Sequence, residues 1–187
     1  MTNAVHILNS TASPESRLDE IVDAVHATYG LPAKLRHLPL DLPRAYDGSR
    51  GQYNSTALLS QVLASRSDDS EKTIAIVDID LYIPVLTFVF GEAQFAGPTA
   101  IVSIHRLANE FYGLPSDPNA LFDRLGKEVI HELGHTFGLY HCHQFECVMR
   151  SSTYVEEIDL KRATLCTSCR AILHDTITQP LDRTVSA

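Results

Sequence analysis

The sequence is poor in positive charge. It has 15 lysine and arginine residues against 23 aspartate and glutamate residues, which gives a formal net charge of -8. Binding to nucleic acid or to an anionic membrane surface requires a basic patch, and no basic cluster stands out in this sequence. We therefore expect neither nucleic acid nor a membrane among the partners.

Long hydrophobic runs are also missing. The longest candidate, LYIPVLTFVFG at 81–91, is too short to cross a bilayer and contains Pro84. The N-terminus, MTNAVHILNS, has no basic start followed by an apolar stretch, so it does not resemble a secretory signal. These absences predict a cytoplasmic protein. Its 187 residues, 44% of them hydrophobic, are enough for one domain with a substantial core.

Cysteine is absent from the first 141 residues and then occurs four times, at Cys142, Cys147, Cys166 and Cys169. In a reducing compartment disulfides are rare, and clustered cysteines are more often metal ligands. Two disulfides remain an alternative, and the CxxC pair in CTSC is also compatible with a redox pair. The spacing CHQFEC plus a distant CxxC favours a closed structural zinc site with four thiolate ligands.

The order of apolar and polar segments predicts an α/β fold with a mixed, twisted sheet. Strands are expected at 4–9, 34–42, 73–82, 86–94 and 99–107, and helices at 13–30, 55–66 and 117–137. Residues 41–54 are expected to form a polar loop, and 179–187 a frayed end.

Signals at the ends of these segments support the assignment. Ser13 and Pro14 suit a helix start, Gly30 suits a helix end, and Asp117 suits the start of the last helix. The apolar strand at 73–82 is expected to be central. The segment 86–94 follows it too closely for a helical crossover, so we expect it to be antiparallel and at the sheet edge.

The last predicted helix contains the sequence HELGHTFGLYH. His131 and His135 lie four residues apart and therefore share one helical face, where both can bind one metal. Glu132 can reach a water bound to that metal. Gly138 can end the helix with a positive φ, which allows His141 to return to the same metal. A histidine pair alone is also found on polar helix surfaces, but the full pattern HExxHxxGxxH is the metzincin signature.

Three histidines leave the fourth position of a zinc ion for water and substrate. Met149 is the candidate for the methionine turn expected beneath such a site, with ordinary core packing as the alternative. Cys142 directly follows His141, and in an extended segment neighbouring side chains point in opposite directions. We therefore expect two metals on the two sides of one segment, with the cysteine site acting as a clip that holds His141 and Met149.

The segment HELGHTFGLYHCHQFECVM, continued to CTSC, resembles the archaemetzincin family. HExxHxxGxxH is followed at once by a cysteine, then by CxxxxCxM and a distant CxxC. The stretches SRGQY, DIDLYIPVLTFVFGEAQ and AIVSIHRL are also similar to the family. The resemblance implies a single metzincin-like domain over 1–187, with a sheet and an active-site helix in an N-terminal subdomain at 1–138. A C-terminal subdomain at 139–187 would carry the methionine turn and the clip.

The same resemblance implies two zinc ions per chain. His131, His135 and His141 would bind the catalytic zinc, with Glu132 as the general base. The residues implied for the structural zinc are Cys142, Cys147, Cys166 and Cys169. An edge strand above the catalytic zinc would hold the substrate main chain.

Gly91, Glu92 and Ala93 are the residues of the expected edge strand that would lie near the cleft. Their alternative role is simply to end an edge strand at a turn. Tyr154 is a candidate for stabilising an oxyanion near the catalytic zinc, although no spacing requires it. Arg50 and Tyr53 belong to a loop that is either solvated or folded over the site. His143 is interpreted as an exposed loop histidine rather than as a group beside the metal.

Together these features predict a monomeric zinc-dependent metallopeptidase that acts on peptide or protein substrates. An amidase or aminopeptidase of narrow specificity is the alternative enzyme. A zinc-stabilised peptide-binding module is the alternative outside enzymes, but such a module has no need of a general base such as Glu132.

Overall fold

The computed structural model describes residues 2–11, 15–66, 68 and 71–178. The predicted helix start at Ser13 and Pro14 and the predicted frayed end at 179–187 lie outside these residues. Among the described residues, no helix combines the length and the apolar character needed to span a bilayer.

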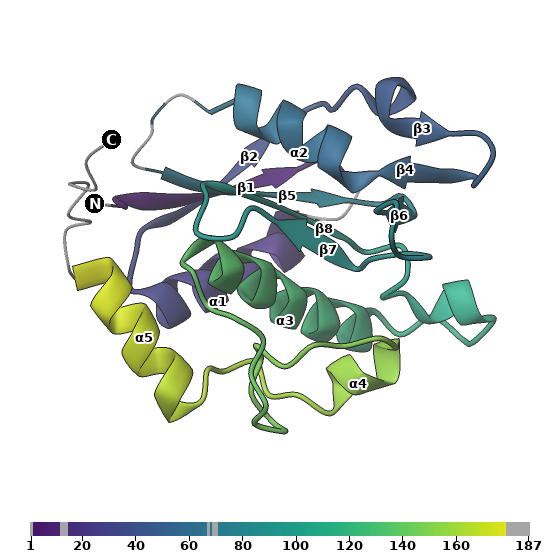
Figure 1. The fold of residues 1–187 in the computed structure, drawn as a ribbon. Coiled ribbons are helices and arrows are strands. Elements are labelled where there is room, and N and C mark those ends of the chain that lie inside the picture. Colours follow the sequence, from purple (N-terminus) through teal and green to yellow (C-terminus); the bar gives the residue numbers. More distant parts are fainter. Residues whose placement is uncertain (1, 12–14, 67, 69–70, 179–187) are drawn as a thin grey trace.

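A five-stranded mixed sheet forms the centre of the molecule, in the order β2-β1-β5-β8-β7 (Figure 1). Its strands are β1 (Ala4–Asn9), β2 (Ala33–His37), β5 (Glu71–Val77), β7 (Gly91–Ala93) and β8 (Thr99–Ser103). The first four in the spatial order are parallel to their neighbours, and β7 is antiparallel to β8 at the edge. The predicted mixed sheet with an antiparallel edge strand is thereby confirmed.

Helices cover both faces of this sheet (Figure 1). Helix α2 (Ser55–Ala64) lies on one face, and α1 (Glu15–Tyr29) and α3 (Pro118–Thr136) lie on the other. Along β5, Ile74 packs in the core beneath α1 and α3, whereas Ala75 packs in the core beneath α2. A strand buried on both faces needs a continuous apolar run, which explains the sequence TIAIV.

The expected strand 73–82 is wrong in its second half. β5 ends at Val77, and Leu81–Tyr82 forms β6 in a second, three-stranded sheet. Between them, the Asp80 carboxylate accepts a hydrogen bond from Gln52 at 3.1 Å and pairs with Arg106. These polar contacts direct the chain out of the central sheet.

The segment at 41–54 is not the loop that the sequence suggests. It contains a short 3-10 helix, η1 (Leu42–Ala45), and the strands β3 (Tyr46–Asp47) and β4 (Gln52–Asn54), which complete the small sheet with β6. Strands of two or three residues leave no hydrophobic periodicity to detect, and their pairing partner lies far along the chain.

The expected edge strand 86–94 is also shorter than predicted, because only its last part joins the sheet. The carbonyl of Thr87 instead accepts hydrogen bonds from the side chains of Arg50 (3.1 Å) and Gln52 (3.0 Å). The carbonyl of Leu86 accepts from Arg50 at 2.9 Å. Side chains of the small sheet thus replace a strand partner here and fix the segment before β7.

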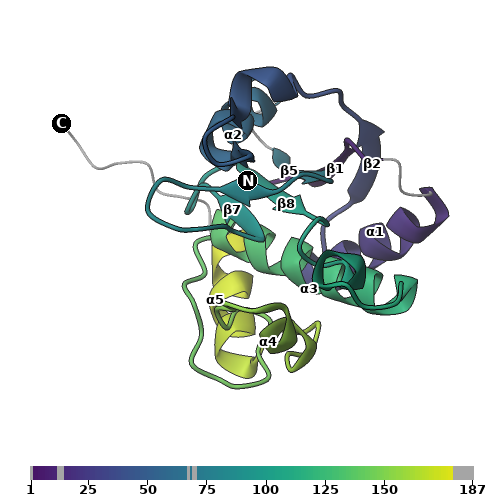
Figure 2. The same ribbon diagram turned by 90° about the vertical axis from the view of Figure 1, so that its right-hand side faces the viewer.

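The C-terminal part of the described chain lies under α3 (Figure 2). After the 3-10 helix η2 (Asn109–Tyr112) and α3, it forms α4 (Val155–Asp159) and α5 (Thr167–Thr178). Two ion pairs join it to α3: Arg124 to Asp159 at 2.7 Å, and the fully buried pair of Lys161 and Glu128 at 3.3 Å. Removing one partner of a buried pair is strongly destabilising, so the Lys161–Glu128 pair fixes the C-terminal layer most firmly.

Candidate metal centres and active site

Helix α3 carries two of the three histidines. Asp117 caps its start, because its carboxylate accepts from the backbone N–H of Asn119 and Ala120, both at 3.0 Å. Gly138 ends it with φ +84°, a conformation that glycine adopts at low cost. The chain then turns back so that His141 approaches the helix. Nitrogen atoms of the three histidines lie within 4.8 Å of one another.

The imidazole rings on α3 are oriented by backbone carbonyls. Nδ1 of His131 lies 2.8 Å from the carbonyl oxygen of Val148, and Nδ1 of His135 lies 2.7 Å from that of Leu139. Each Nδ1 therefore donates, and each Nε2 keeps its lone pair. The two Nε2 atoms are 3.1 Å apart. Two lone pairs at this distance repel unless a cation lies between them. Two nitrogens on a tetrahedral zinc ion are about 3.3 Å apart, so the pair fits zinc.

Burial sets the charge states at this cluster. It lowers the pKa of His131 well below the ordinary value, and it also lowers the pKa of His135 and of His141. Neutral imidazole is the form that binds a metal. Burial, followed by the nearby carboxylates of Glu128 and Glu92, raises the pKa of Glu132 well above the ordinary range. Glu132 is buried beside the histidine cluster.

The edge strand passes directly over Glu132. A Cβ atom on Gly91 would lie 2.7 Å from Cγ and 2.8 Å from Oε1 of Glu132, which is closer than any side chain allows. Glycine is therefore required for β7 to approach Glu132. The side chain of Glu92 points the other way and accepts from the hydroxyls of Ser55 and Thr56 at the start of α2.

Met149 lies beneath the histidine helix and is fully buried. A Cβ atom on Gly134 would come within 2.4 Å of its Sδ, so the methionine packs against the helix backbone between His131 and His135. The sequence pattern predicted Met149 but not Gly134. The signal for Gly134 was a glycine inside a well-formed helix, which usually has a packing reason.

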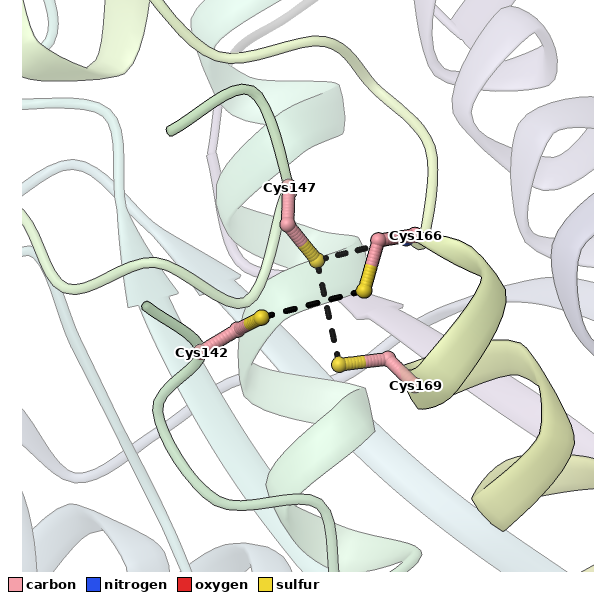
Figure 3. Close-up of side chains that lie close together, drawn as sticks. All are labelled: Cys142, Cys147, Cys166 and Cys169. Carbon is pink, nitrogen blue, oxygen red and sulfur yellow. Dashed lines mark hydrogen bonds between the residues drawn. The ribbon is translucent and has the colours of Figure 1, made fainter. Parts of the chain in front are cut away.

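The four cysteines form a second cluster between the segment after His141 and the start of α5 (Figure 3). Sγ atoms of Cys142 and Cys166 are 3.7 Å apart, and those of Cys147 and Cys169 are 3.8 Å apart. A disulfide would need about 2.05 Å. Four thiolates around one tetrahedral zinc ion have their sulfur atoms about 3.8 Å apart, so this donor set and spacing fit zinc.

Backbone N–H groups support two of these sulfur atoms. The N–H of Gln144 donates to Sγ of Cys142, and the N–H of Cys166 donates to Sγ of Cys147, both at 3.4 Å. A backbone hydrogen bond from Cys169, together with side-chain contacts from the neighbouring cysteines, lowers the pKa of Cys166 to about 7. The thiolate, which is the metal-binding form, is thus favoured at Cys166, whereas burial raises the pKa of Cys147 and of Cys169.

Backbone hydrogen bonds connect the two clusters. The N–H of Cys142 donates to the carbonyl of Met149 at 2.9 Å, and the carbonyl of Val148 orients His131. Val148 stands between Cys147 and Met149, so a shift of the cysteine cluster would move the acceptor that fixes a histidine.

A cleft of about 360 Å³ runs over the histidines, between the segment before β7 and the segment after Met149. Its lining is formed by Ile83, Leu86, Thr87, Phe88, Val89, Phe90, Gly91, Glu128, His131, Glu132, His135, His141, Ser151, Ser152 and Thr153. Sequence reasoning missed Glu128 and its partner Lys161. Their pairing spans 33 residues, and no local motif marks it.

The remaining sequence candidates are placed outside the cluster. His143 and Tyr154 are exposed, and neither lines the cleft. Arg50 holds the carbonyls of Leu86 and Thr87, so it braces the cleft rim. Tyr53 packs against Tyr46 in the small sheet.

Comparison with known proteins agrees with this geometry. The model of Peptidase family M54 matches residues 18–175. The chain belongs to this family. The archaemetzincin of Methanocaldococcus jannaschii is 42% identical over 137 residues, covering 73% of this chain and 74% of that protein. The archaemetzincin of Pyrococcus horikoshii is 37% identical over 158 residues, covering 82% of this chain and 84% of that protein.

Solved structures show the same fold. The crystal structure of archaemetzincin from Methanopyrus kandleri superposes with a TM-score of 0.83 at 33% identity, covering 95% of this chain and 96% of that one. A zinc-dependent peptidase from Methanocorpusculum labreanum superposes with a TM-score of 0.82 at 32% identity, covering 90% and 99%. The M54 chain described here is therefore a zinc metalloprotease with the archaemetzincin fold, as the sequence resemblance predicted.

Proposed function

We propose that this M54 protein hydrolyses peptide bonds by activating a water molecule at His131, His135 and His141, with Glu132 as the general base. The observation that carries the proposal is the buried Glu132 side chain, which lies against Gly91 of β7 and lines the same cleft as the three histidines. A zinc ion held by the three histidines would acidify the attacking water and polarise the scissile carbonyl.

The properties of Glu132 suit proton transfer. Its raised pKa brings the carboxylate closer to the working range of a general base, which must accept a proton and later release it. In the proposed mechanism Glu132 takes a proton from the attacking water and delivers it to the leaving amine. The close approach of Gly91 prevents the carboxylate from moving away toward the sheet.

The edge strand supplies main-chain groups for an extended substrate. Phe90 pairs with Ser103 through a hydrogen bond of 2.8 Å, and Gln94 pairs with Thr99 at 2.9 Å. Hydrogen-bonded and non-hydrogen-bonded pairs alternate in an antiparallel ladder. The backbone of Glu92 therefore faces β8, and the N–H and C=O groups of its two neighbours, Gly91 and Ala93, face the open edge.

The substrate would add a strand to this edge. Of the three residues expected from the sequence, Gly91 and Ala93 would contact the substrate main chain. The carboxylate of Glu92 would instead hold α2, through Ser55 and Thr56.

The proposal includes two zinc ions per chain, one at the histidines and one at the four cysteines. A four-thiolate site is closed and serves folding, whereas a three-histidine site keeps a position for the reaction. The sulfur spacings near 3.7 and 3.8 Å support the structural assignment.

The test is a comparison of the wild-type protein with Glu132→Gln, each assayed on a peptide library and each analysed for zinc. Loss of the base is expected to lower kcat/KM by about 10²- to 10⁴-fold while both zinc ions remain. Cleavage by Glu132→Gln at the wild-type rate contradicts the mechanism. Cleavage confined to peptides with a free N-terminus would favour the aminopeptidase alternative.

A further inference from the structure

Two aromatic rings are exposed beside the histidine cluster. Phe95 is 47% exposed and Tyr140 is 75% exposed, and their ring centroids are 4.3 Å apart. Phe95 follows β7, and Tyr140 immediately precedes His141. We call Phe95 and Tyr140 the aromatic pair. Exposed apolar groups that gather next to a functional cleft are typical of binding surfaces.

The turn that carries Phe95 is anchored to the end of α3. The N–H of Ala96 donates to the carbonyl of His135 at 2.9 Å. The Lys72 ammonium donates to the carbonyls of Gly97 (2.9 Å) and Thr136 (2.8 Å), and so ties the turn to the last residue of the helix. Because these contacts fix the backbone before any ligand arrives, little conformational entropy is lost on binding.

The same contacts give the direction of β7 relative to α3. Gly91 lies over Glu132, and Ala96 lies at the carbonyl of His135, so both elements run the same way past the cluster. A substrate that pairs antiparallel with β7 runs the opposite way. The substrate residues before the cleaved bond then pass the aromatic pair, and the residues after the bond extend toward Glu128.

The distance along the strand gives the position of the contact. β7 is extended from Gly91 to Ala93, and Phe95 lies in the turn two residues beyond its end. In a peptide whose cleaved bond lies near Gly91 and Glu132, the two residues before the bond would pair along β7. The third or fourth preceding residue would then reach the turn that carries Phe95.

We propose that Phe95 and Tyr140 form a subsite for an apolar side chain at the third or fourth residue before the cleaved bond. This inference rests on the proposed peptidase function, and it gives that function a substrate class: peptides with a hydrophobic residue upstream of the cleavage point. Aromatic side chains dominate binding energies at such contacts, because they bury a large area with few rotatable bonds.

The experiment measures binding separately from cleavage. One peptide carries phenylalanine at the third and fourth residues before the cleaved bond, and the other carries serine there. Both are titrated against the zinc-loaded Glu132→Gln variant. We expect the phenylalanine peptide to bind about tenfold more tightly, and a second substitution, Phe95→Ser or Tyr140→Ser, to reduce that ratio to about twofold. Zinc content is measured for each variant, because Tyr140 is next to His141.

The matched control is Tyr112→Ser in the same Glu132→Gln background. Tyr112 is 42% exposed and its ring centroid lies 5.0 Å from that of Phe111, but it belongs to η2, before α3, and not to the turn after β7. The binding ratio should stay near tenfold in this control. Equal binding of the two peptides, or a ratio that survives Phe95→Ser, overturns the subsite.

Failure of the subsite and failure of the peptidase function give different results. If the wild-type protein cleaves peptides without any preference at these positions, the function stands and the subsite is wrong. If no peptide is cleaved but the binding ratio depends on Phe95, the subsite stands and the hydrolytic mechanism is wrong. If the preference for phenylalanine is found only at residues after the cleaved bond, the proposed antiparallel direction of the substrate along β7 is wrong.

Discussion

The three-histidine cluster and the four-cysteine cluster both draw residues from one segment, 141–149, yet they are built differently. The histidines are held from outside: α3 carries two of them, and carbonyls of Leu139 and Val148 orient the rings. The cysteines come from two loops and the first turn of α5, and they contact chiefly one another. A site positioned by a helix persists without its metal, whereas loops brought together by four thiolates depend on it.

The first prediction concerns the cysteine cluster and has the largest expected effect on stability. Cys166→Ser combined with Cys169→Ser removes two thiolates, and we expect the melting temperature to fall by more than about 10 °C, as for the loss of a structural zinc. Zinc affinity at the histidines should fall as well, because the carbonyl that orients His131 is next to Cys147. Calorimetry and zinc titration measure the two effects. An unchanged melting temperature would contradict a stabilising role for the cysteine site.

The second prediction separates the two sites by metal removal. Dialysis against a weak chelator should take the zinc from the open histidine site first and abolish cleavage, with a change in melting temperature of only a few degrees, about 2–4 °C. Elemental analysis before and after dialysis should show one of two zinc ions lost. Loss of both ions together would show that the two clusters do not differ in their affinity for zinc.

The third prediction tests the packing that both clusters share. Gly134→Ala places a methyl group against Met149, and overpacking of this kind costs about 1–3 kcal/mol. Because the new Cβ atom would lie only 2.4 Å from the Met149 Sδ atom, we expect the upper part of this range, above the gain of about 1 kcal/mol from replacing glycine in a helix. Gly126→Ala on the same helix is the control, since its Cβ atom would meet only Ile21 at an ordinary 3.5 Å. We expect Gly134→Ala to unfold at lower denaturant concentration and Gly126→Ala to be neutral or slightly stabilised.

The last prediction has the smallest effect. His143 is exposed and stands one residue past Cys142, outside both clusters. His143→Ala should change the free energy of unfolding by less than about 0.5 kcal/mol and leave the zinc content at the wild-type value. Loss of a zinc ion from this variant would show that His143 binds one of the metals. It would contradict the proposed set of three histidine and four cysteine ligands.

The residues of both clusters could be predicted because their signals are local. His131 and His135 share a helical face by spacing alone, and the cysteines fall into two short pairs, Cys142 with Cys147 and Cys166 with Cys169, which the metal-ligand spacing relates to each other. Long-range contacts could not be predicted in the same way. The pairing of Lys161 with Glu128, and the fit of Gly91 over Glu132, join residues more than 30 positions apart. The small sheet was missed because its strands are too short to show a period.

The adjacency of His141 and Cys142 has a consequence for how the chain can change in length. One residue inserted between them would displace one of the two side chains from its cluster, because the two neighbours belong to different clusters. An insertion among the exposed residues 113–116, before α3, meets no such constraint. The segment from His141 to Met149 is therefore expected to tolerate substitution at its exposed positions but not a change in its number of residues.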